Sequence, residues 1–135
     1  MHNTELARDY ILRSTARLRA VEVLFEAESW ADVVRESQEL VELALKALLR
    51  SVGVDPPRIH DVSDVLEAEA HRLPDCLRGE LATLTRISRD LRRDRELSFY
   101  GAEDLTPSGF YTRDDGERAR RDARTIVERV RPHIK

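Results

Sequence analysis

Hydrophobic residues recur at helical spacing along most of the chain. Near the N-terminus they step by three and four residues, which is one stripe of a long helix. Beyond Trp30 the hydrophobic residues fill a broad face of a second helix. Ser29 and Asp32, at the start of that helix, are spaced as an N-cap and N3 pair. The two stripes are Ala7, Ile11, Ser14, Leu18, Val21 and Phe25, and then Val33, Val34, Leu40, Val41, Ala44, Leu45, Leu48 and Leu49. This spacing predicts a long first helix and a second helix that is the central element of the core.

Glycine, proline and capping residues predict where the middle helices begin and end. Gly53 provides a C-terminal cap for the second helix, and Pro56-Pro57 cannot continue it. Asp61 and Asp64 are spaced as another capping pair. We therefore expect a short third helix that runs to about Leu73.

Two more helices and one long connection complete the pattern. Pro74-Asp75 opens a fourth helix, and Thr112 with Asp115 caps the last one. The connection over residues 101–112 is long for a small helical domain, which favours a functional role for it. The inward stripes of these helices are Leu77, Leu81, Leu84, Ser88 and Leu91, and then Ala119, Ala123, Ile126 and Val130. Because no alternating strand pattern appears, we predict one all-α domain over residues 1–135, an up-and-down bundle of about five helices.

Composition and charge narrow the classes of function. The 135 residues are 41% hydrophobic and 36% charged, with a net charge of −3. Residues 81–135 are mildly basic, with 13 bases and 10 acids. That excess is too small for a nonspecific duplex-DNA binder, but it allows a local anion or RNA site. No signal peptide and no apolar run long enough to span a membrane is visible, so we expect a cytoplasmic protein that does not bind membranes.

The sequence predicts no metal and no cofactor. Cys76 is the only cysteine, which excludes an intrachain disulfide and a multi-cysteine zinc site. The histidines share no ligand-like spacing with one another or with Cys76, and no glycine-rich phosphate loop exists. His60 follows a proline turn and precedes a helix, where capping or packing is the simplest role. Glu42 and Lys46 are spaced as a surface ion pair on the second helix.

The end of the predicted fourth helix carries the best candidate site. At about 100° per residue, Arg89, Arg93, Glu96 and Tyr100 fall close to one line, which faces away from the core stripe. Such a line is typical of a solvated, salt-bridged face. A tyrosine hydroxyl beside arginines on an outward face, followed by the long connection, instead favours a ligand or partner surface.

Three segments together resemble the HEPN domain family. The second-helix stretch "QELVELALKALL", the loop "PPRIHDV" and the C-terminal stretch "RELSFYGAEDLTPSGFYTRDDGERARRDA" occur in the family's order over roughly residues 4–131. The resemblance implies a bundle of four or five helices and a homodimer. It also implies a metal-independent endoribonuclease site, in which an arginine is followed by four to six residues and a histidine. In members paired with a minimal nucleotidyltransferase, one residue and a tyrosine often follow.

This chain departs from the family motif at the residue that moves the proton. Arg93 takes the arginine place and Tyr100 the tyrosine place, but Ser98 stands where the histidine is expected. An imidazole titrates near neutrality and can act as general base or acid, whereas a serine hydroxyl cannot. Losing that role costs about 10²- to 10⁴-fold in rate. The motif is therefore a degenerate ribonuclease motif.

Three hypotheses follow. The first is a noncatalytic homodimer that binds a nucleotide or RNA phosphate through Arg89, Arg93, Ser98 and Tyr100, beside a minimal nucleotidyltransferase in a toxin–antitoxin-like pair. In a dimer formed through the fourth helix, two copies of these arginines and of Tyr100 would line one groove. The second is an active ribonuclease toxin in which another residue, with His60 the leading candidate beside Arg93 and Tyr100, supplies the acid/base group. The third is an assembly subunit without a ligand, in which Trp30, Phe99 and Phe110 pack an interface.

Overall fold

The structure, a computed structural model, describes residues 2–58, 61–100 and 106–135; side chains are described for all of these except residue 2 and residues 94–100. The described residues form α-helices and two short 3₁₀ turns, and none of them is in a strand. The elements are α1 (His2–Glu26), α2 (Trp30–Ser51), α3 (Ser63–Ala68), η1 (Ala70–Arg72), α4 (Asp75–Arg78), α5 (Leu81–Tyr100), α6 (Pro107–Phe110), α7 (Arg113–Val130) and η2 (Arg131–His133). The predicted all-α class is confirmed.

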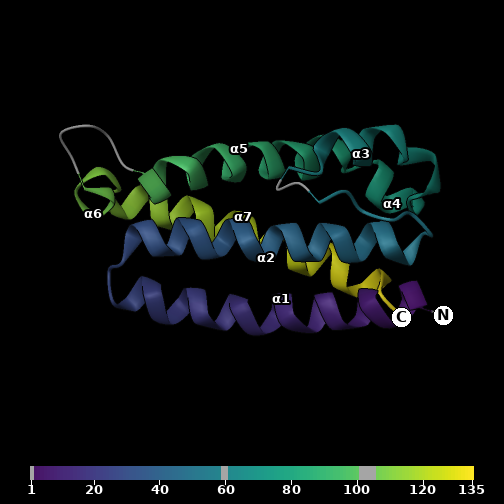
Figure 1. Cartoon of the computed structure of the whole chain (residues 1–135), viewed down its shortest axis with the longest axis horizontal. Helices are drawn as coiled ribbons and strands as arrows, with labels where there is room; N and C mark the ends of the chain where they lie inside the picture. The colour runs from purple at the N-terminus through teal and green to yellow at the C-terminus, as the bar shows by residue number, and fades with distance from the viewer. Residues whose placement is uncertain (1, 59–60, 101–105) are drawn as a thin grey trace.

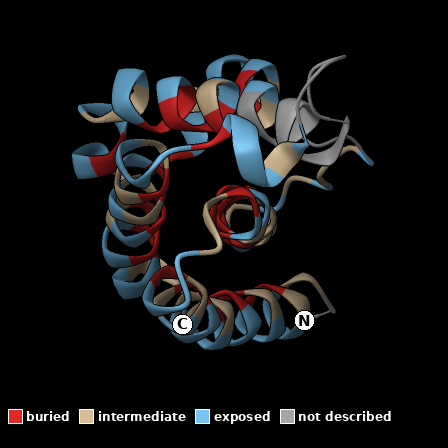
Figure 2. Ribbon diagram, turned by 90° about the vertical axis from the view of Figure 1, so that its left-hand side faces the viewer, coloured by how far each residue is buried: buried red, intermediate tan, exposed pale blue. Residues whose placement is uncertain are grey.

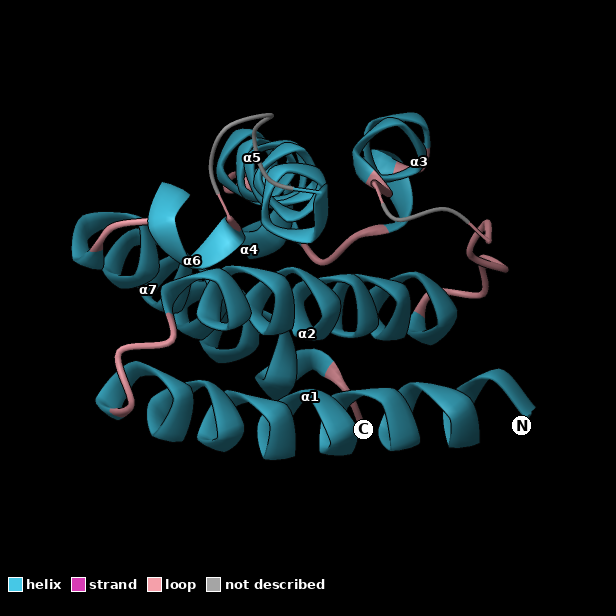
Figure 3. Cartoon of the chain, turned by 60° about the vertical axis from the view of Figure 1, so that its left-hand side comes forward, coloured by secondary structure: helices cyan, strands magenta, loops and turns pink. Residues whose placement is uncertain are grey.

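Helix α2 lies at the centre of the bundle. Figure 1 shows α1 on one side of α2 and α5 on the other, with α7 behind, and all three helices contact α2. Successive long helices run in opposite directions, so the connections are up and down. In Figure 3 α3 lies beside α5 in the same layer, and the two helices are in contact. The motif helix α5 is thus supported by α2 on one side and by α3 on another.

The core follows the predicted stripes. Buried segments face the interior between the helices (Figure 2), and the largest fully buried side chains include Leu40, Leu45, Leu48 and Leu49 of α2. Leucines that are completely withdrawn from water each contribute about 1.5–3 kcal/mol. The predicted inward residues of α7 are all buried as well. A helix buried from several sides needs the broad apolar face that the α2 sequence carries.

Several helix ends form as predicted. Gly53 has φ of 82°, and Val54 N donates to Leu49 O at 2.9 Å, which is a Schellman ending for α2. Thr112 and Asp115 form a complete capping box at α7. Ser29 is the N-cap of α2, but its hydroxyl donates to the Asp32 carboxylate at 2.6 Å and caps no backbone N–H.

Three predicted boundaries are wrong. The third helix starts at Ser63, with Val62 as its N-cap, and it stops at Ala68 before the separate turn η1. The predicted fourth helix is two helices, α4 and α5, because the chain breaks at Gly79, a residue with about 1 kcal/mol less helix propensity than alanine. Within the connection 101–112, the one-turn helix α6 forms, with Thr106 accepting a hydrogen bond from Gly109 N at 3.1 Å.

Trp30 packs inside its own chain. Its ring meets Phe25 edge to face, with centroids 5.0 Å apart, and the Arg113 guanidinium lies 5.6 Å from the Trp30 ring centroid. Gly116 of α7 lies so close to Trp30 that a Cβ there would be 2.8 Å from Trp30 Cε3. Trp30 therefore joins the α1–α2 turn to α7, which leaves it poorly suited to an interface between subunits.

Candidate functional site

The outward face of α5 carries the two predicted arginines. Leu84 and Leu91 are buried beneath it, while the side chains of Arg89 and Arg93 are 48% and 68% exposed. The backbone is helical through Tyr100, so positions 93 and 98 are about 140° apart around one continuous helix. The side chains of Ser98 and Tyr100 lie outside the described residues, and so does His60. Of the predicted site, the structure therefore places Arg89 and Arg93 in full.

Arg89 is held by carboxylates of the neighbouring helix α3. Its Nη2 donates to Glu67 Oε1 at 2.8 Å and lies 3.7 Å from Asp64 Oδ1. The hydrogen bond and the charge of Glu67 raise the pKa of the Arg89 guanidinium above its usual range. A phosphate that approaches Arg89 has to compete with these acids.

Asp61 fastens the segment before α3 to α5. Its Oδ1 accepts hydrogen bonds from Ser63 N and from the Ser88 hydroxyl, both at 2.9 Å. Burial raises the pKa of the Asp61 carboxyl, but the hydrogen bonds from Ser63 and Ser88, with the charge of Arg89, outweigh burial and hold that pKa below its usual range. The residue directly after His60 in the chain is therefore bound to the helix that carries Arg93.

Asp61→Asn is expected to lower the free energy of unfolding by about 0.5–1 kcal/mol at pH 7, since an amide oxygen still accepts the two hydrogen bonds but without charge, and solvent screens part of the loss. Because the folded pKa of Asp61 is depressed, its contribution is present at neutral pH and is lost as the pH falls below about 4. Urea unfolding of both proteins at pH 7 and near pH 3 measures this.

The control for Asp61 is Asp64→Asn, which removes the same charge from an exposed side chain. It should change stability by less than about 0.5 kcal/mol at either pH. A difference between wild type and Asp61→Asn that stays constant across the two pH values would contradict the role of the Asp61 charge.

Arg93 is the most exposed charged group of the motif that the structure describes. Its Nη2 lies 3.9 Å from Asp90 Oδ1, and Asp90 also accepts a hydrogen bond from Arg86 Nη1 at 3.3 Å. One carboxylate is thus shared by two guanidinium groups. An exposed, planar guanidinium is suited to bidentate binding of phosphate.

Two features were missed or misjudged in the sequence. Cys76 Sγ and His133 Nε2 lie 3.4 Å apart although they are 57 residues apart in the chain. The Glu42–Lys46 ion pair forms at 3.2 Å, but the two side chains are only 19% and 14% exposed, so it is a largely buried pair and not a surface one. The four-residue spacing predicted the Glu42–Lys46 pair but not its burial, and no local signal brings Cys76 to His133. Both the burial and the Cys76–His133 contact depend on tertiary packing.

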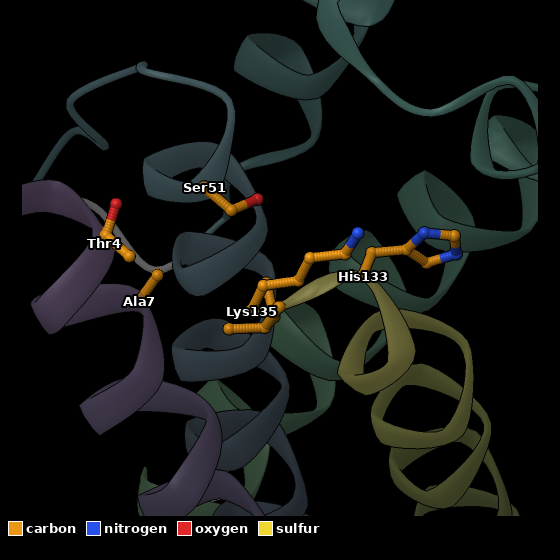
Figure 4. Close-up of a pocket in the computed structure, with 6 residues that line it drawn as sticks. Thr4, Ala7, Ser51, His133 and Lys135 are labelled. Atoms are coloured by element: carbon orange, nitrogen blue, oxygen red, sulfur yellow. The ribbon is translucent and has the colours of Figure 1, made fainter.

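A small pocket lies at the end of the bundle where the two termini meet. Figure 4 shows Thr4 and Ala7 of α1, Ser51 of α2, and His133 and Lys135 around it, and its volume is about 180 Å³. The C-terminal end of α5 lies at the opposite end of the molecule (Figure 1). This pocket is therefore separate from the arginine motif.

Among the described residues, no three His, Cys, Asp or Glu side chains gather as a metal site would require. Within the same residues, no helix combines the length and the apolarity that crossing a bilayer requires.

Comparison with known proteins identifies the family. The family model of the HEPN domain matches residues 7–133, and the chain belongs to this family. The chain is also 28% identical over 139 residues to a Methanocaldococcus jannaschii protein named "Putative toxin MJ1304", an alignment that covers 98% of this chain and 91% of that protein. No solved structure gives a significant match.

Proposed function

We propose that this chain is a noncatalytic HEPN protein that binds a nucleotide or RNA phosphate at the outward face of α5. The observation that carries the proposal is the pairing of an exposed Arg93 with a serine at position 98, where the family motif has its histidine. The first provides an anion contact, and the second removes the usual proton shuttle. Tyr100 stacks on the base or donates its hydroxyl to the ligand, and Arg89 orients the phosphate.

The biological setting is a toxin–antitoxin-like pair. It is supported by the name of the archaeal relative, "Putative toxin MJ1304", and by the membership of this chain in the HEPN family. The proposed partner is a minimal nucleotidyltransferase, as the resemblance of the Arg93 and Tyr100 motif implies. The chain acts as a homodimer, and the α5 faces of two copies bring two Arg93 side chains to one groove. Two guanidinium groups in one groove provide twice the positive charge for holding a phosphate, and binding of the phosphate needs no general acid or base.

The test is binding of a short fluorescent, 5′-phosphorylated RNA by fluorescence anisotropy. Arg93→Ala should weaken the affinity about tenfold, which is the loss expected for one solvent-exposed, charge-assisted contact. The matched control is Arg13→Ala, since Arg13 is also exposed and also lies 3.9 Å from an aspartate one turn away, but on α1. Equal weakening by both substitutions would mean that only net charge matters and would contradict a site at α5.

A second candidate function is an active, metal-independent endoribonuclease that uses His60 as its acid/base group. The observation that favours it is the hydrogen bond from Ser88 to Asp61, which ties the segment following His60 to the motif helix. It requires the His60 imidazole to reach the phosphate bound by Arg93, directly or through one water. Loss of cleavage in His60→Ala would support it.

A further inference from the structure

A groove away from the α5 motif runs between α1 and α7. Its volume is about 380 Å³, and it is lined by Thr15, Leu18, Arg19, Glu22, Arg124 and Arg131. Three of the six lining residues are arginines and one is an acid, although the whole chain carries a net charge of −3. The groove is thus a positively charged site on an acidic protein.

The single lining acid is already engaged. Glu22 accepts a hydrogen bond from Arg124 Nη2 at 2.7 Å with one oxygen and from Arg120 Nη1 at 2.8 Å with the other. The guanidinium groups of Arg19 and Arg131 form no ion pair or hydrogen bond with any residue that the structure describes. Two guanidinium groups of the groove are therefore available to an external anion.

Apolar side chains lie beside the unpaired Arg19. Leu12 and Val23 are 70% and 65% exposed. Around α1, these two positions lie within about 20° and 40° of Arg19, and they are separated by about 16 Å along the helix axis. The edge of the groove thus presents an arginine between two exposed apolar side chains, over a length of three helical turns.

We propose that the α1/α7 groove binds an acidic, amphipathic helix of a partner protein. Arg124 of α7 and Arg131, the residue that follows α7 and begins η2, are seven residues apart, which at helical rise is about 10.5 Å and equals two turns of a helix laid in the groove. Carboxylates on one side of that helix pair with Arg131 and Arg19, and leucine-like residues on its adjacent side cover Leu12 and Val23. This interaction goes beyond the proposed phosphate site, and it uses different residues.

The lining chemistry favours a peptide over RNA. Single-stranded RNA is held by aromatic stacking platforms together with basic grooves. None of the six lining residues is aromatic, whereas exposed aliphatic side chains flank the arginines. Aliphatic area contributes when it packs against a protein helix, but it adds little beside a phosphate backbone.

The experiment measures binding of a fluorescent 20-residue peptide designed as an amphipathic helix, with glutamates at seven-residue spacing beside leucines. A scrambled peptide of the same composition and a 5′-phosphorylated RNA serve as competing probes. We expect the designed peptide to bind wild type at least about tenfold more tightly than the scrambled one. Arg19→Ala/Arg131→Ala and Leu12→Ser/Val23→Ser should each abolish that preference, whereas Arg13→Ala should retain it.

Thermal unfolding of each variant serves as the control for folding, and the midpoint should stay close to that of wild type because the substituted side chains are exposed. The proposal is overturned if the designed peptide binds no better than the scrambled one, or if its preference survives both double substitutions. It is also overturned if the double arginine variant weakens RNA binding but leaves peptide binding unchanged. Because Arg93 is intact in these variants, loss of peptide binding alone leaves the phosphate site at α5 unaffected.

Discussion

Ser98→His is expected to raise metal-independent RNA cleavage by about 10²- to 10⁴-fold over wild type, because it restores the acid/base group at the place that the family motif gives it. An imidazole at this position can accept the proton of an attacking RNA 2′-hydroxyl near neutral pH. Because positions 93 and 98 lie about 140° apart on one continuous helix, the new imidazole of one copy would act on a phosphate held by the exposed Arg93 of the second copy, across the proposed dimer. The measurement is the rate of cleavage of a mixed RNA pool in the presence of EDTA.

The control for this gain of activity is the double variant Ser98→His/Arg93→Ala. Without the guanidinium, the new activity should fall back towards the wild-type level. The profile of rate against pH should also show a group that titrates near neutrality, absent in wild type. If Ser98→His cleaves no faster than wild type while it still binds RNA with wild-type affinity, then the serine is not what separates this chain from an active enzyme.

Gly116→Ala is expected to cost about 1–3 kcal/mol of stability relative to the same substitution at Gly79, since overpacking a fixed contact carries a cost of this size. A Cβ at position 116 would lie 2.8 Å from Trp30 Cε3. The Trp30 ring has little room to move, because Phe25 packs against it and Arg113 covers both rings. Chemical denaturation of both variants gives the difference directly.

Gly79→Ala is the matched control because Gly79, the C-cap of α4, also has right-handed helical φ and ψ, which alanine adopts without strain. At Gly79 the new Cβ would meet the Cys76 carbonyl oxygen at 3.6 Å, an ordinary contact. Equal stabilities of the two variants would show that the Trp30 ring shifts freely, and the packing of α7 on the α1–α2 turn would then have to be revised.

Local sequence signals predicted the features that local interactions determine. The capping box of Thr112 and Asp115 involves residues three apart, and the positive φ of Gly53 follows from the chain ending a helix there. The apolar stripes of α2 and α7 likewise follow from helical periodicity alone. The capping residues and the apolar stripes predict an all-α fold, because each of them depends only on residues that are close together in the sequence.

The ion pairs around the candidate sites depend on tertiary packing and could not be predicted this way. Arg89 is bound to Glu67 across the α3–α5 contact, 22 residues away, and Glu22 joins Arg120 across 98 residues. Sequence spacing gave Arg89 an outward position, but it could not show that carboxylates of α3 surround it. The prediction for position 98 rests instead on one residue type at one place in the family motif, and the side chain of Ser98 lies outside the described residues.

The account is tested most directly by incubating the purified wild-type protein with a mixed RNA pool and EDTA, beside Arg93→Ala and His60→Ala. A noncatalytic phosphate-binding protein predicts that wild type cleaves no faster than the Arg93→Ala background. Wild-type cleavage that disappears in both variants would contradict the account and would establish a ribonuclease whose acid/base group is His60.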